Sequence, residues 1–229
     1  MVLSLAYRTI YKYVILVTRF FDPEAHLEIY RRRLPHWRQA GVTYFVTFRL
    51  IDSLPKQKLT ALNDEKARWL AFNPPPHNER QKDEYHSNFS GRVQTWLDVG
   101  HGKCVLAQPE IRRLVENALR FFNDQRYRLG EFVVMPNHVH ALVEPLANHR
   151  LERILHSWKS FAAKEINAIT ASKGSIWHRE SFDHIVRSPA QLARIEQYIL
   201  YQAFIVVQVS SANPLKYRIR TDMHLTGLT

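Results

Sequence analysis

The sequence predicts an α+β fold: a ferredoxin-like βαββαβ antiparallel sheet with helices on one face and a helical-hairpin insertion after the first strand. Two observations lead to this fold class. Stretches rich in β-branched and aromatic residues alternate with amphipathic helical stretches. In addition, the strand-like stretches Arg126–Met135 and His138–Glu144 are separated only by a Pro-Asn turn, so they must pair antiparallel. A doubly wound parallel sheet does not fit, because no glycine-rich phosphate loop follows a strand.

The first strand is expected at Val42–Ile51, where valine, threonine and aromatic residues are concentrated. The chain then enters an insertion at residues 55–100, which we expect to form a helical hairpin. Its two helices, Lys56–Phe72 and Glu79–Val99, carry apolar residues at helical spacing. The run Asn73-Pro-Pro-Pro-His77 separates them, because proline cannot continue a helix.

The remaining elements follow in order along the chain. Pro109–Asn123 is the clearest helix, because its apolar residues recur at i, i+3, i+4, i+7 and i+8 and a proline begins it. The last helix begins at Ser188, which can cap it together with Gln191. The other expected elements are a short edge strand at Cys104–Ala107, a helix at Leu151–Ala171, a bent strand at Ile176–Arg187 and a β-like run at Phe204–Val209.

These elements divide the chain into an N-terminal extension (1–29), a single domain (30–203) and a C-terminal tail (204–229). In the extension, Ile10–Phe21 is apolar but is interrupted by Lys12 and Arg19, and it is too short to span a membrane. No cleavage site follows it, so we expect neither a secretion signal nor a membrane partner. Cys104 is the only cysteine, which excludes a disulfide framework and fits a reducing cytoplasm.

The charge balance points to a polyanionic partner. Lys and Arg number 32 against 21 Asp and Glu, which gives a net charge of +11. Such an excess favours nucleic acid, and an anionic membrane second. Tyr30–Arg38 alternates basic and aromatic residues and includes Arg31, Arg32 and Arg33. This composition is typical of a segment that contacts nucleic acid, although a solvated linker can have it too.

A pair of histidines stands at the centre of the second hairpin strand. Side chains two residues apart on a strand leave the same face of a sheet, so the imidazoles of His138 and His140 are expected side by side. Val139, Ala141 and Val143 then point into a core on the other face. Two imidazoles on one face can share a divalent metal ion, or they can be a chance pair on a wet surface.

The last helix adds a nucleophile and a further ligand. Tyr198 and Gln202 lie one helical turn apart, with Arg194 one turn before them. A tyrosine hydroxyl can attack phosphorus, and an amide oxygen can bind a hard cation. Arg194 is placed to hold a non-bridging phosphate oxygen. Tyr201 is the rival nucleophile, but Ile205 at its i+4 position cannot bind metal.

Five segments occur in the order Thr43-Tyr-Phe-Val-Thr-Phe-Arg-Leu, Val133-Val-Met-Pro-Asn-His-Val-His-Ala-Leu-Val, Leu155-His-Ser-Trp-Lys-Ser-Phe, Ser181-Phe-Asp-His-Ile-Val-Arg and Tyr198-Ile. Together they closely resemble the REP-associated tyrosine transposases, single-tyrosine members of the HUH nuclease superfamily with an IS200-like transposase domain. The resemblance extends from about Tyr30 to Gln202. The Met-Pro-Asn-His-Val-His block, in this order with the Trp-Lys block and the terminal tyrosine, is highly specific.

The resemblance implies a metal-dependent enzyme that cleaves and rejoins single-stranded DNA near hairpin repeats of bacterial genomes, with Mg²⁺ or Mn²⁺ as cofactor. By that resemblance, His138 and His140 are metal ligands and Tyr198 forms a 5′-phosphotyrosine, leaving a free 3′-OH. Such an enzyme would work in the cytoplasm at the nucleoid, as a monomer or a homodimer.

The chain departs from the family pattern after the tyrosine. Family members usually read Tyr-Ile-x-x-Asn-Pro, whereas the last two positions here are Gln202 and Ala203. Glutamine at this position resembles the third metal ligand of the wider single-tyrosine group. Gln202 is therefore the expected third ligand.

DNA binding is expected of Lys159, Lys164, Arg187 and Arg194, together with the arginines of Tyr30–Arg38. Phosphate contacts by these residues would make DNA binding strongly salt-dependent.

Two other functions are compatible with the sequence. One is a catalytically weak or inactive protein that binds DNA hairpins. The other is a metallohydrolase unrelated to DNA, which would complete its site with a further histidine such as His178 or His184.

Overall fold

The computed structural model describes residues 19–31, 35–74 and 78–212. Its centre is a sheet of β3 (Tyr44–Arg49), β4 (Tyr127–Val134), β5 (His138–Pro145) and β6 (Phe182–Ile185). The strands lie in the order β4-β5-β3-β6, and each neighbouring pair is antiparallel. The predicted α+β fold with an antiparallel sheet is confirmed, including the β4-β5 hairpin with its Pro-Asn turn.

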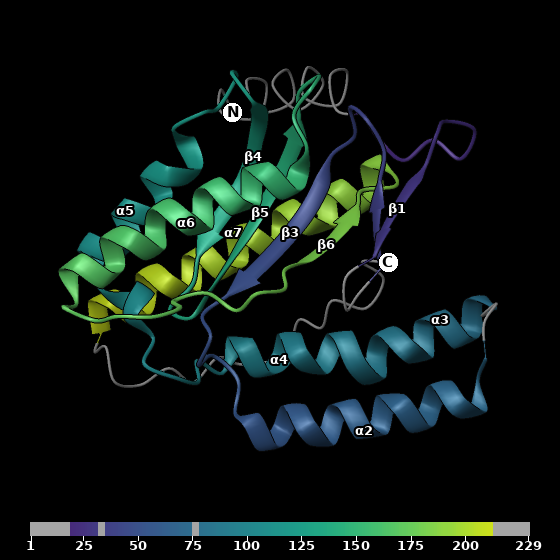
Figure 1. The fold of residues 1–229 in the computed structure, drawn as a ribbon, viewed down its shortest axis with the longest axis horizontal. Helices are drawn as coiled ribbons and strands as arrows, with labels where there is room; N and C mark the ends of the chain where they lie inside the picture. The colour runs from purple at the N-terminus through teal and green to yellow at the C-terminus, as the bar shows by residue number, and fades with distance from the viewer. Residues whose placement is uncertain (1–18, 32–34, 75–77, 213–229) are drawn as a thin grey trace, which may run out of the picture.

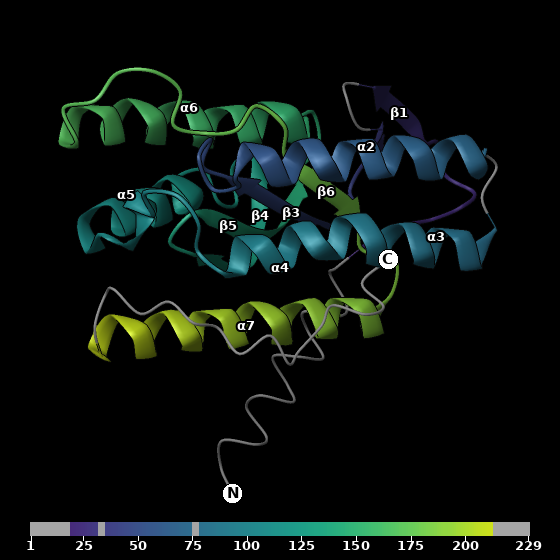
Figure 2. The same cartoon turned by 90° about the horizontal axis from the view of Figure 1, so that it is seen from below.

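Helices cover both faces of this sheet (Figures 1 and 2). The two helices within the βαββαβ unit, α5 (Pro109–Arg120) and α6 (Leu151–Ile169), lie on one face, as predicted. The helix that follows the unit, α7 (Pro189–Ala212), lies on the opposite face. Strand periodicity explains the arrangement, because buried residues of β3 alternate between the two sides: Val46 belongs to the core under α5 and α6, and Phe45 to the core under α7.

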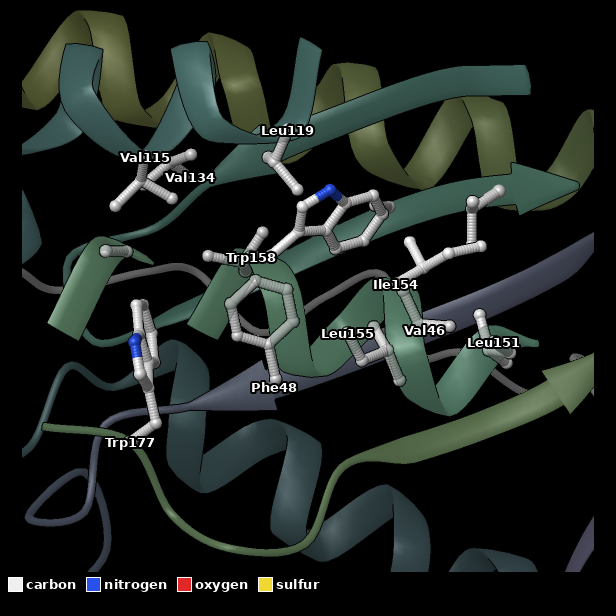
Figure 3. Close-up of a cluster of buried hydrophobic side chains, with 14 of the residues drawn as sticks. Val46, Phe48, Val115, Leu119, Val134, Leu151, Ile154, Leu155, Trp158 and Trp177 are labelled. Atoms are coloured by element: carbon white, nitrogen blue, oxygen red, sulfur yellow. The ribbon is translucent and has the colours of Figure 1, made fainter. Parts of the chain in front are cut away.

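The core under α5 and α6 is centred on Trp158 of α6, which is 3% exposed. Figure 3 shows its indole among Phe48, Val115 and Leu119. The indole nitrogen donates to the Tyr127 hydroxyl at 2.8 Å, and that hydroxyl donates to the Leu119 carbonyl at 2.7 Å. The one polar atom of Trp158 is therefore satisfied within an apolar layer.

The helical insertion is as predicted and projects beside one end of the sheet (Figure 1). It consists of α2 (Lys56–Phe72), α3 (Glu79–Tyr85), a π-helical turn η1 (His86–Gly91) and α4 (Arg92–Asp98). Trp69 of α2 contacts the rings of Tyr85 and Phe89, with centroids 5.4 and 6.2 Å away, so aromatic packing joins its two arms.

The two ends of the insertion are fastened to each other. The backbone N–H of Lys103 donates to the Asp52 carboxylate at 2.8 Å. Gly102 has φ +90°, and a Cβ there would lie only 2.6 Å from the Asp52 carbonyl oxygen. Only glycine accommodates both that backbone conformation and so close an approach.

Two predicted strands are wrong. Within Cys104–Ala107, residues Val105–Ala107 form a short 3₁₀ helix (η2) that buries Leu106. Phe204–Val209 is helical, because α7 continues to Ala212. Val206 lies in the same core cluster as Ile195 and Ile199, so the buried face of the helix continues into the β-branched run that suggested a strand.

The N-terminal segment forms a separate small hairpin of β1 (Glu28–Arg31) and β2 (Pro35–Arg38). Arg38 of this hairpin is ion-paired with Asp183 of β6 at 2.7 Å and with Glu152 of α6. The hairpin is thereby fixed to the domain edge. The predictions for Arg32, Arg33 and most of Ile10–Phe21 lie outside the described residues.

The expected domain boundaries at 29/30 and 203/204 stay predictions, although β1 and α7 cross them.

Candidate active site

The two imidazoles of His138 and His140 lie side by side on the α7 face of β5, as the strand period predicts. Both residues are fully buried, with 0% exposure. Their Nε2 atoms are 3.0 Å apart. Val139 and Ala141 belong to the core on the opposite face. The predicted alternation along β5 is therefore confirmed.

Hydrogen-bond partners determine which ring nitrogen of each histidine carries its proton. Asn137 uses its amide N–H to donate to the His101 carbonyl, so its Oδ1 accepts from Nδ1–H of His138 at 2.7 Å. His140 Nδ1 lies 2.8 Å from the Thr47 hydroxyl, while its Nε2 faces the amide nitrogen of Gln94 at 3.1 Å. Both Nδ1 atoms are thus protonated, and the lone pairs of both Nε2 atoms are available to bind a common ligand between the two rings.

This is the arrangement that metal-binding histidines adopt. A ligating imidazole usually donates its other N–H to a carbonyl or hydroxyl oxygen, which fixes the tautomer and the ring orientation. Asn137 and Thr47 supply those oxygens. Phe45 stacks on the His140 ring with centroids 5.3 Å apart and limits its rotation.

Tyr198 of α7 reaches the histidine pair. Its hydroxyl lies 3.3 Å from Nε2 of His140, and the residue is 5% exposed. Gln202, one turn later, is 3% exposed, and its side-chain oxygen has no hydrogen-bond partner among the described residues. The Tyr198 hydroxyl therefore lies beside His140, and the unpaired amide oxygen of Gln202 follows one turn later on the same helix.

The insertion contributes two further residues, Gln94 and Asp98 of α4, which sequence reasoning missed. The Gln94 amide nitrogen lies 2.8 Å from the Tyr198 hydroxyl and 2.9 Å from Oδ1 of Asp98. Asp98 Oδ1 is 3.6 Å from Nε2 of His138. The only available sequence signal was their i, i+4 spacing on the last helix before Gly100, and that spacing does not reveal where the helix docks.

The electrostatics of the site follow from its burial. Desolvation lowers the pKa of His138 to about 3. Desolvation and the neighbouring His138 lower the pKa of His140 well below its usual value. Desolvation also raises the pKa of Asp98 to about 7, although hydrogen bonds from Gln94 and Tyr198 act in the opposite direction. Neutral donors are thus held in a dry site that disfavours any uncompensated charge.

The pKa of Tyr198 lies well above its usual value. Burial is the main cause and the adjacent Asp98 carboxylate adds to it, whereas hydrogen bonds from Gln202 and Gln94 favour the ionised form. The hydroxyl is therefore protonated at neutral pH unless a positive charge approaches it.

The donor set fits a divalent cation. One ligand atom each from Asp98, His138 and His140 lies within 4.8 Å of the others. Two convergent imidazole lone pairs, a carboxylate and the unpaired Gln202 oxygen are nitrogen and oxygen donors that Mg²⁺ or Mn²⁺ accepts. Neither His178 nor His184 belongs to this cluster, so the described residues do not provide the third histidine of the metallohydrolase alternative.

The predicted DNA-binding residues lie at several places, and their role stays a prediction. Lys159 and Lys164 belong to α6, across the sheet from the histidine pair. The Lys159 ammonium donates to the carbonyls of His178 and Arg179 at 2.8 and 3.1 Å. Lys164 is exposed.

The predicted arginines are also distributed over more than one element. Arg187 is exposed and lies over the rings of Phe21 and Trp37, 5.9 and 5.8 Å from their centroids. Arg194 is exposed on α7, whereas Tyr198 one turn later is buried. Arg31 is the last residue of β1.

Residues 103–202 match the family model described as "Transposase IS200 like". This stretch is therefore similar to IS200-like transposase domains. It contains four of the site residues, namely His138, His140, Tyr198 and Gln202. Gln94 and Asp98 lie before its matched start. The family resemblance seen in the sequence is thus confirmed over these 100 residues.

Solved structures also show likeness to the chain. One is a REP-associated tyrosine transposase bound to a REP hairpin, with 14% identity over 80% of this chain and 73% of that chain and a TM-score of 0.34. Another is a candidate transposase from Deinococcus radiodurans, with 12% identity over 81% of this chain and 98% of that chain and a TM-score of 0.29. No curated protein matches the sequence. Both TM-scores are low, so the fold described above rests on the topology of this chain alone.

None of the helices in the described part of the chain has the length and apolarity that a membrane span requires.

Proposed function

We propose that this protein is a metal-dependent transposase that cleaves and rejoins single-stranded DNA near hairpin repeats through Tyr198. The observation that carries the proposal is the placement of the Tyr198 hydroxyl 3.3 Å from His140 Nε2, inside a cluster of metal-capable donors. The IS200-like match over residues 103–202 supports the same assignment, because it includes the histidine pair as well as Tyr198.

In the proposed reaction, the Tyr198 oxygen attacks the phosphorus of a DNA phosphodiester and loses its proton. The bond from phosphorus to the 3′ oxygen breaks, and that oxygen takes up a proton as a free 3′-OH. The 5′ end stays bound as a phosphotyrosine. Because the phosphate ester to the 3′ oxygen has been replaced by a phosphate ester to Tyr198, a 3′-OH can reverse the step without an external energy source.

His138, His140, Asp98 and Gln202 would hold Mg²⁺ or Mn²⁺. When bound, the cation would stabilise the negative charge that develops on the phosphoryl oxygens. Among the protein's own residues, Asn137 and Thr47 fix the imidazole orientations, and the buried setting excludes water that would compete as a nucleophile. The net charge of +11 favours binding of the DNA backbone.

The test is a covalent adduct. The protein is incubated with Mn²⁺ and single-stranded DNA that carries the hairpin flanking its gene, and denaturing gels are examined for a protein–DNA species. We expect an adduct with the wild type and with the matched control Tyr201→Phe, and none with Tyr198→Phe. An adduct that persists in Tyr198→Phe would refute the nucleophile assignment, and hairpin binding without any adduct would favour a protein that only binds DNA.

A further inference from the structure

Gln94 stands at the centre of the site although it belongs to the insertion, 104 residues before Tyr198. Its amide nitrogen is within hydrogen-bond distance of three acceptors: the Tyr198 hydroxyl at 2.8 Å, Asp98 Oδ1 at 2.9 Å and His140 Nε2 at 3.1 Å. An amide nitrogen carries only two hydrogens. The three acceptors therefore compete for Gln94.

We propose that Gln94 is a positioning residue for the Tyr198 nucleophile, supplied to the transposase domain by the helical insertion. This inference rests on the proposed function. If the lone pair of His140 and the carboxylate of Asp98 are engaged by a cation, the hydrogens of Gln94 are left for the Tyr198 oxygen. Gln94 then fixes the direction of that oxygen and stabilises negative charge on it.

Glutamine is chemically suited to this role. Its amide donates hydrogen bonds but does not ionise, so it stabilises a phenolate without protonating it. Tyr198 is 5% exposed, so solvent cannot supply the donors that a phenolate needs, and fixed donors in a dry site act more strongly than water would. Gln202 provides a second hydrogen bond to the same hydroxyl from α7.

The shape of the insertion directs Gln94 toward the sheet. The π-helical turn His86–Gly91 directly precedes α4. Such a turn adds a residue to the helical repeat and rotates the following face by about 100° per residue, and it is frequent at functional sites. Leu97 of α4 and Phe89 of the turn are buried, at 3% and 6% exposure, so packing holds the rotated face in place.

The test compares Gln94→Ala and Gln94→Glu with a matched control, Gln81→Ala. Gln81 belongs to the same insertion, but its side chain bonds to Asn73 and Asn78 within it. Adduct formation is measured at saturating DNA and Mn²⁺, DNA affinity is measured separately, and the Mn²⁺-dependent rise in melting temperature reports metal binding. We expect both Gln94 variants to form the adduct about 100-fold more slowly, as for loss of one fixed donor. For Gln94→Ala, which introduces no new metal ligand, DNA affinity and the Mn²⁺ response should match those of the control.

A second readout does not need activity. With 3-fluorotyrosine at position 198, fluorine NMR should give one narrow signal in the wild type and in Gln81→Ala, and a shifted, broadened signal in Gln94→Ala. Adduct formation at the wild-type rate, an unchanged fluorine signal, or a loss of the Mn²⁺ response in Gln94→Ala would each overturn the positioning role. An adduct in Tyr198→Phe would instead overturn the proposed function, so the two failures are distinguishable.

Discussion

The buried histidine pair should make the fold sensitive to mild acid. In the folded chain desolvation lowers the pKa of His138 from 6.5 to about 3. At His138 the unfolded chain therefore binds a proton between these two values while the folded chain does not, so the contribution of neutral His138 to stability is complete above about pH 6.5 and is lost as the pH decreases toward 3. Each pH unit in this window costs about 1.4 kcal/mol, which gives about 2 kcal/mol at pH 5 from His138 alone.

Urea unfolding at about pH 7.5 and pH 5, in metal-free buffer with a chelator, measures this effect. Asp98 acts in the opposite direction in this window, because its pKa is raised to about 7 and the folded chain therefore binds a proton there that the unfolded chain does not. The His138 effect is accordingly measured as a difference: between the two conditions, His138→Gln should lose about 2 kcal/mol less unfolding free energy than the wild type. The matched control is His149→Gln, which removes an exposed histidine outside the site. Equal acid dependence in the wild type and His138→Gln would refute the reasoning.

Three further predictions follow from the site and the core. Mn²⁺ should raise the melting temperature of the wild type, His140→Ala should abolish that rise, and Asp98→Asn should reduce it; full retention in His140→Ala would contradict the metal site. Trp158→Ala should lower the unfolding free energy by about 3–5 kcal/mol, because it empties the core of Figure 3, and urea titration would show this. Arg38→Ala should cost about 1–3 kcal/mol in the same assay, because the Asp183 carboxylate, whose side chain is 2% exposed, keeps His36 at 2.6 Å but loses its arginine. A loss below about 1 kcal/mol would count against this ion pair.

The parts of the site that the sequence predicted are those determined by local period. His138 and His140 share a face because a strand repeats every two residues, and Tyr198 and Gln202 share a face because a helix repeats every 3.6. Neither inference needs knowledge of how distant elements pack. The antiparallel pairing of β4 with β5 could be predicted in the same way, because two strands joined by a two-residue turn can pair only as a hairpin.

The residues that were missed depend on tertiary docking. Gln94 and Asp98 read as ordinary polar positions of an insertion helix, and only the contact of α4 with β5 and α7 gives them a role. The same limit applied to Phe204–Val209, whose β-branched residues indicated a strand, because only the tertiary structure shows that α7 continues through them and that Val206 packs in its core. Lys159 was predicted to bind DNA because of its charge. Charge alone does not distinguish a lysine that contacts a DNA phosphate from one whose ammonium donates to backbone carbonyls, as Lys159 does here.

The place of the insertion in the chain explains how it can serve the site. It leaves the sheet after β3 and returns before α5, and its two ends are fastened where Gly102 approaches Asp52. The Asn137 side chain connects this junction to the site, because its amide donates to the His101 carbonyl while its oxygen orients His138. A movement of the insertion would therefore displace Gln94, Asp98 and the His138 ring together. For this reason the insertion, although it precedes the stretch that matches the transposase model, determines the positions of site residues and belongs to the site.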